Sequence, residues 1–130
     1  LDALTIQDAT TSVVFVGPIH VTNSVDVTSQ GTITQQSTLM AGEAVGYLAG
    51  GAIAVQGALT AGTNVTLVST AGALTLTAPV TATSGDLTAS AGTSLSATQQ
   101  LTAGTGMSLE AGTTMTLAET ADLSAGSGGV

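Results

Sequence analysis

The sequence predicts an all-β fold: a parallel β-solenoid, or β-helix, with triangular coils of about 20–22 residues and three short strands per coil. Two observations lead to this prediction. Apolar residues recur with a period near 20, and within each period they fall in three short segments where apolar and hydroxyl side chains alternate. A repeat of this length is typical of proteins whose units stack on one another, because no single unit can bury a core alone.

The period is defined by the first apolar residue of each segment, which we call the anchor. Equivalent anchors are 20 residues apart in the first three coils and 20 to 22 apart in the rest. In chain order, the anchors are Val13, Ile19 and Val25; Ile33, Leu39 and Val45; Ile53, Leu59 and Val65; Leu74, Val80 and Leu87; Leu95, Leu101 and Met107; and Met115 and Ala121.

The alternation indicates strands, because successive side chains of a strand point to opposite faces. Val65-Thr66-Leu67 and Met107-Ser108-Leu109 are examples of the pattern. The expected buried set is Leu67, Leu76, Leu101 and Leu109, and the expected outward set is Thr66, Thr75, Thr102 and Ser108. Clusters such as Ala61-Gly62-Thr63-Asn64 separate the segments and turn the backbone at low steric cost. Three strands and three corners make a triangular coil, stacked in parallel on the next at about 4.8 Å.

We expect residues 1–130 to form a single solenoid segment that is part of a longer array. Residues 1–12 contain Leu4-Thr5-Ile6 and are expected as an irregular or partial first coil, and residues 13–130 as about five and a half coils. Two positions fit poorly. Gln35 is predicted to point into the core and Ala121 is a weak anchor, so these registers are off by one residue or contain a bulge.

The composition excludes several functions. The 130 residues include no Lys or Arg, eight acidic residues and one His, for a net charge of −8. Binding to nucleic acid and binding to anionic membranes both depend on cationic side chains, so the composition excludes the first and disfavours the second. No apolar stretch approaches the length needed for membrane insertion, and the absence of Cys excludes disulfides and Cys-based metal sites. With Phe15 and Tyr47 as its aromatic residues the chain could be disordered, but disorder does not explain apolar positions in register over five coils.

Two stretches resemble the repeat units of filamentous-haemagglutinin-type exoproteins. They are Gly85-Asp86-Leu87-Thr88-Ala89-Ser90-Ala91-Gly92 and Leu109-Glu110-Ala111-Gly112-Thr113-Thr114-Met115-Thr116-Leu117. The resemblance covers residues 50–125 by motif and the first fifty by period. It implies a right-handed parallel β-solenoid from a large secreted bacterial adhesin, located outside the cell or on the bacterial surface.

No catalytic, cofactor-binding or metal-binding residue is predicted. His20 is expected to face solvent near Met40, with no second His or Cys to complete a metal site. Asp26 and Asp86 are expected in one outward column, three coils apart. That separation is about 14 Å by strand spacing, against the roughly 5–9.5 Å of glycosidase carboxylate pairs. Glu43, Glu110 and Glu119 are placed in corners. Asn64-Val65-Thr66 matches a glycosylation acceptor pattern, which also arises by chance.

Outward pairs on the first face resemble the flat Thr arrays of ice-binding β-solenoids. They are Thr32/Thr34, Ala52/Ala54, Ala73/Thr75, Ser94/Ser96 and Thr114/Thr116. Thr is also a common exposed strand residue, which explains the same pattern without a function.

The sequence therefore favours a structural and adhesive rod without catalysis. A host or cell-surface ligand would be bound by regions outside the segment. Three alternatives stay open: a filament subunit that self-associates along the solenoid axis, an ice-binding solenoid, and a carbohydrate-active β-helix enzyme, for which the missing basic residues and the carboxylate spacing are unfavourable.

Overall fold

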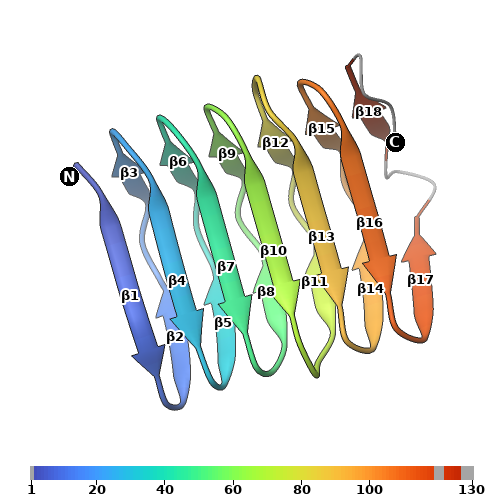
Figure 1. Cartoon of the computed structure of the whole chain (residues 1–130), viewed down its shortest axis with the longest axis horizontal. Coiled ribbons are helices and arrows are strands. Elements are labelled where there is room, and N and C mark those ends of the chain that lie inside the picture. The colour runs from blue at the N-terminus through green and yellow to red at the C-terminus, as the bar shows by residue number, and fades with distance from the viewer. Residues whose placement is uncertain (1, 119–121, 127–130) are drawn as a thin grey trace.

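The chain folds as the predicted β-solenoid, with three parallel sheets wound around one core. The structure, a computed structural model, describes residues 2–118 and 122–126, and this part of the chain contains 18 strands and no helix. Each sheet has six strands, and each strand pairs with the strand three places further along the chain (Figure 1).

The sheets are named here by the order in which the chain enters them. Sheet A contains β1 (Leu4–Ala9), β4 (Val25–Ser29), β7 (Val45–Ala49), β10 (Val65–Ser69), β13 (Leu87–Ala91) and β16 (Met107–Ala111). Sheet B contains β2 (Ser12–Phe15), β5 (Thr32–Gln35), β8 (Ile53–Val55), β11 (Leu74–Leu76), β14 (Ser94–Ala97) and β17 (Thr114–Leu117). Sheet C contains β3 (Ile19–Val21), β6 (Leu39–Ala41), β9 (Leu59–Ala61), β12 (Val80–Ala82), β15 (Leu101–Ala103) and β18 (Leu123–Ala125).

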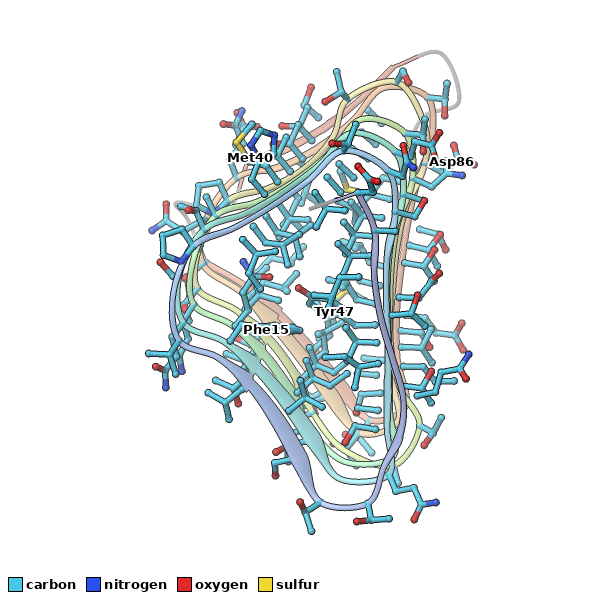
Figure 2. The ribbon with its side chains drawn as sticks, turned by 90° about the vertical axis from the view of Figure 1, so that its left-hand side faces the viewer. Phe15, Met40, Tyr47 and Asp86 are labelled. Atoms are coloured by element: carbon cyan, nitrogen blue, oxygen red, sulfur yellow. The ribbon has the colours of Figure 1, made fainter. Side chains whose placement is uncertain are left out.

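The core is a set of ladders in which apolar side chains stack from coil to coil. In the view along the axis, the side chains of all three sheets meet inside the ribbon (Figure 2). Leu67, Leu76 and Leu101 are fully buried, as predicted, and Leu109 packs partly buried against the core near its C-terminal end. Thr66 and Ser108 are exposed, while Thr75 and Thr102 are half-buried on the outer face.

Gln35 faces the core without a bulge. It pairs in register with Phe15 in β2 and with Val55 in β8, and it is 1% exposed. The expected inward orientation is confirmed, and the register error or bulge suggested for this position is wrong. Hydrogen bonding explains how a polar side chain is accommodated here, as described below.

The prediction at Ala121 is wrong. The last strand of Sheet C begins at Leu123, which pairs with Leu101, so this coil is longer than expected at the corner before the strand. Ala121 itself lies outside the described residues. At the other end, Leu4-Thr5-Ile6 belongs to β1, which pairs with β4 and shifts register between Ile6 and Ala9.

Corner glycines allow the coils to approach closely. A Cβ added at Gly62 would collide with the carbonyl oxygen of Gly42 one coil below, and one added at Gly42 would collide with that of Thr22. The amide of Gly62 donates to the carbonyl of Ala41 at 3.0 Å. Glycine is therefore favoured at Gly42 and Gly62, because the backbone of the coil below occupies the space of a side chain at these two positions.

Candidate functional site: the outer faces of the sheets

Each sheet presents columns of outward side chains, in which residues of successive coils pair. Sheet A has two columns: Asp26, Gly46, Thr66, Thr88 and Ser108; and Thr28, Leu48, Val68, Ser90 and Glu110. The main column of Sheet B is Val14, Thr34, Ala54, Thr75, Ser96 and Thr116. Sheet C has His20, Met40, Thr60, Thr81, Thr102 and Ser124.

Asp26 and Asp86 do not share a column, contrary to the prediction. Asp26 lies within β4, whereas Asp86 precedes β13 at the corner between Sheet C and Sheet A. Alternation turns both side chains outward, but Asp26 follows the anchor of its strand, whereas Asp86 precedes the anchor of its strand. The structure therefore brings these two carboxylates even less into register than the sequence suggested.

Glu43 and Glu110 lie in different parts of the coil. Glu43 is at a corner, as expected, where its Oε2 accepts a hydrogen bond from Ser24 Oγ at 3.3 Å. Glu110 was expected at a corner but lies within β16, where it pairs with Ser90. Glu119 lies outside the described residues. Within residues 2–118 and 122–126, no three His, Asp or Glu side chains group as metal ligands would.

The Asp86 corner forms a ladder of side chains that accept hydrogen bonds from the next coil. Asn64 Oδ1 accepts from the amide of Asp86 at 2.8 Å, and Asp86 Oδ1 accepts from the amide of Gly106 at 2.9 Å. Thr105 Oγ1 also donates to Asp86 Oδ1. The Thr105 hydroxyl and the Gly106 amide lower the pKa of Asp86, because they stabilise the carboxylate. The side chain projects outward at this corner (Figure 2).

Asn64 of the glycosylation pattern thus has a structural role in this ladder. It is exposed, as is Thr66 two residues later. The sequence marked Asn64 as a possible modification site but gave no indication of its contact with the next coil, since that contact depends on which residues the corner stacks together.

His20 faces solvent, as predicted, and pairs with Met40 on Sheet C. Met40 is 52% exposed and lies on the outside of the solenoid (Figure 2). Hydroxyl side chains fill the rest of this column from Thr60 to Ser124. In Sheet B the main column is interrupted by Val14 and Ala54, so in the described residues neither sheet carries an unbroken Thr array. Ice binding stays a prediction.

Inside the core, Tyr47 and Gln35 form a buried polar pair. The Tyr47 hydroxyl donates to Gln35 Oε1 at 2.7 Å. Gln35 Nε2 donates to the carbonyls of Ser37 at 2.9 Å and Gly57 at 3.0 Å. Burial raises the pKa of Tyr47 well above its usual value. Phe15 packs against Tyr47 with ring centroids 6.1 Å apart, and both rings point into the core (Figure 2).

A shallow, open hollow of about 300 Å³ lies on the outer face of Sheet A over Gly46. Its sides are formed by Asp26, Thr66, Leu48 and Val68. The sequence contained a signal for it, a glycine in the middle of a strand segment, but the alternation pattern alone did not distinguish this glycine from a turn residue.

Comparison with known proteins identifies the repeat. The haemagglutinin repeat family matches the chain twice, over residues 20–78 and 69–127. No curated protein and no solved structure matches it. No helix in the described part of the chain has the length and apolar character to cross a membrane. The family is a non-enzymatic, adhesin-type family from secreted and surface-exposed bacterial proteins. Because the two matches cover most of the sequence, the chain belongs to the haemagglutinin repeat family, and it is a filamentous-haemagglutinin-like repeat segment.

Proposed function

We propose that this segment is the structural rod of a secreted bacterial surface fibre or adhesin, that it performs no catalysis, and that it lies outside the cell. The observation that supports this most strongly is the continuity of the stack. All three sheets run through the coils in parallel, and apolar ladders follow them from coil to coil. Each coil contacts its neighbours alone, so length increases without a wider core.

The surface also supports a rod. Its outward columns consist mainly of Thr, Ser and Ala, and the described carboxylates are spread over different columns and corners. The net charge of −8 opposes lateral association of such rods. Binding of a host or cell-surface ligand would then be performed by other parts of the protein, which the rod holds away from the cell.

The proposal is tested in bacteria that produce the protein, with an antibody raised against the 130-residue segment. We expect the antibody to label intact cells or to detect the protein in the medium, and we expect the purified segment to release no sugar from bacterial or host polysaccharides. Labelling that requires lysed cells would overturn the location. Release of sugar by the purified segment, lost on replacement of one carboxylate, would overturn the structural role.

A second candidate is a filament subunit that stacks head to tail. Such a subunit would use the C-terminal coil, where Met115 is 39% and Leu117 is 40% exposed although the alternation turns both toward the core axis. A coil stacked on β17 would cover them. Electron microscopy of the purified segment distinguishes the two functions: straight fibres with an axial repeat near 30 Å, about six strand spacings, indicate a filament, and single particles indicate a rod within a longer chain.

A further inference from the structure

Gly46 differs from corner glycines such as Gly42 and Gly62 because no backbone atom occupies the space that its side chain would take. It is the one glycine that lies within a strand of the described residues. Its backbone is not in the left-handed region, and a Cβ added there would meet only Asp26 Oδ1, at 3.2 Å, which is the end of a flexible side chain. Glycine within a strand costs about 0.5–1 kcal/mol relative to Ala. Because Gly46 has no side chain, it leaves a gap between neighbouring side chains in its outward column of Sheet A.

The opening has one anionic side and one apolar side. The distance of 3.2 Å from Asp26 Oδ1 to the missing Cβ shows that this carboxylate leans over Gly46 rather than away from the sheet. Leu48, 43% exposed, and the half-buried Val68 form the apolar side, and the hydroxyl-bearing Thr28 and Thr66 complete the walls.

Within residues 2–118 and 122–126, the carboxylate of Asp26 has no hydrogen-bond partner. None of the described residues donates a hydrogen bond to it, whereas Asp86 accepts two. The whole sequence contains no Lys or Arg that could neutralise it. A Lys or Arg at this position would therefore come from outside these 130 residues, and the apolar wall beside Asp26 favours a cation carried on a hydrocarbon stem.

We propose that the hollow over Gly46 is a docking site for a lysine side chain of a partner protein. The ammonium group lies at Asp26 and donates to its carboxylate, with the hydroxyl oxygens of Thr28 and Thr66 as further acceptors. The four methylenes lie over Gly46 along Leu48 and Val68, because long basic side chains pack their stems on apolar surface while the charged end stays solvated. This inference does not rest on the rod function, because the stacking of the coils does not depend on whether the hollow is occupied.

The test is an NMR titration of the isotope-labelled segment with Nα-acetyl-lysine N-methylamide, compared with the norleucine analogue, which has a similar hydrocarbon side chain and no ammonium. We expect weak, saturable shifts at the amides of residues 26–28, 46–48 and 66–68. Asp26→Asn should weaken binding about two- to fivefold, as an exposed ion pair predicts. Gly46→Ala should weaken it by filling the hollow, at unchanged or higher melting temperature.

Asp86→Asn is the matched control, since it removes the same charge at the corner beside Sheet A and should leave the affinity unchanged. Three results would overturn the proposal: equal weakening by Asp26→Asn and Asp86→Asn, which indicates attraction to the net charge; equal binding of the lysine and norleucine probes; or undiminished binding to folded Gly46→Ala.

Discussion

The buried pair of Tyr47 and Gln35 shows how one polar contact is stabilised inside an aliphatic core. Gln35 takes a position that is apolar in β2, β8 and β11, where Phe15, Val55 and Leu76 are found. Its amide donates to corner carbonyls and its oxygen accepts from Tyr47, so both ends are satisfied. Burying either side chain without the other would lower the stability of the fold, because an unpaired buried polar group is costly.

Replacing Tyr47 with Phe should therefore destabilise the fold, by about 1–3 kcal/mol, because Gln35 Oε1 loses its buried donor. Denaturant unfolding of the single variants and of the double variant Gln35→Leu/Tyr47→Phe measures the coupling. We expect the double variant to be more stable than the sum of the single losses predicts. Additive losses would show that the two side chains do not interact energetically.

The same tyrosine reports on the core by its own absorbance, because the chain contains one Tyr and no Trp. Its pKa is raised by burial, so the neutral form is favoured in the folded state. The corresponding stability is fully present below the pKa of the unfolded chain, about 10, and is lost as the pH rises above it.

Asp86 should make the fold sensitive to acid. Its pKa is lowered in the folded state, so its contribution is present above the unfolded pKa of about 3.9 and is lost as the pH falls through the folded value. Asp86→Asn keeps an oxygen acceptor for Gly106 without the charge. We expect this variant to lose less stability than the native chain between neutral and acidic pH in urea unfolding.

Asp26→Asn is the control for that experiment, since it removes a carboxylate that accepts no hydrogen bond from the described residues. A pH profile of Asp86→Asn that parallels the native profile would argue against a specific role of the Asp86 carboxylate.

At the scale of the strand, alternation determines which substitutions are tolerated. Leu101 and Thr102 are neighbours in β15, but Leu101 is fully buried and Thr102 lies on the outer face. Leu101→Asp should destabilise by more than about 4 kcal/mol, because it buries an unpaired charge, whereas Thr102→Asp should change stability by no more than about 1 kcal/mol. Thermal unfolding by circular dichroism compares them, and similar losses would contradict the assigned faces.

Glycines in strands and corners should respond in opposite directions. Gly62→Ala introduces a Cβ against the backbone of Gly42, so we expect a loss of about 1–3 kcal/mol. Gly46→Ala meets only a flexible carboxylate, so we expect a gain of up to about 1 kcal/mol. Melting temperatures measure both. A loss at Gly46 as large as at Gly62 would show that the strand needs its glycine.

Strand faces were predictable from the sequence, whereas corners and cross-core contacts were not. Leu67 and Leu101 were placed correctly because alternation with period two has one solution with a dry interior. The last Sheet C strand begins at Leu123 instead of Ala121 because a corner can take extra residues without changing the strands beside it. Asp26 and Asp86 were assigned to one column because alternation distinguishes faces but does not distinguish neighbouring columns.

The candidate site shows the same limits. The outward orientation of His20 and Asp26 was predictable from alternation in the sequence. Alternation did not predict the Asn64–Asp86 ladder or the hollow over Gly46, because both depend on which residues three separate coils bring together.

At the scale of the whole molecule, the central claim is that the coils are interchangeable units of a rod. Residues 65–106 comprise β10 to β15, which are two strands of each sheet. The range begins at the first residue of a Sheet A strand, β10, and ends just before the Sheet A strand β16. Removing them pairs β7 with β16 in Sheet A, and duplicating them adds two coils. The Tyr47–Gln35 pair lies outside this range and is retained in both variants.

Small-angle X-ray scattering of the shortened, native and lengthened chains tests this claim most directly. We predict three folded particles with the same cross-section, whose axial lengths differ in steps of about 10 Å, two strand spacings each. A change in cross-section, or scattering typical of an unfolded chain from both variants, would contradict the account of the protein as a rod of stacked, exchangeable coils.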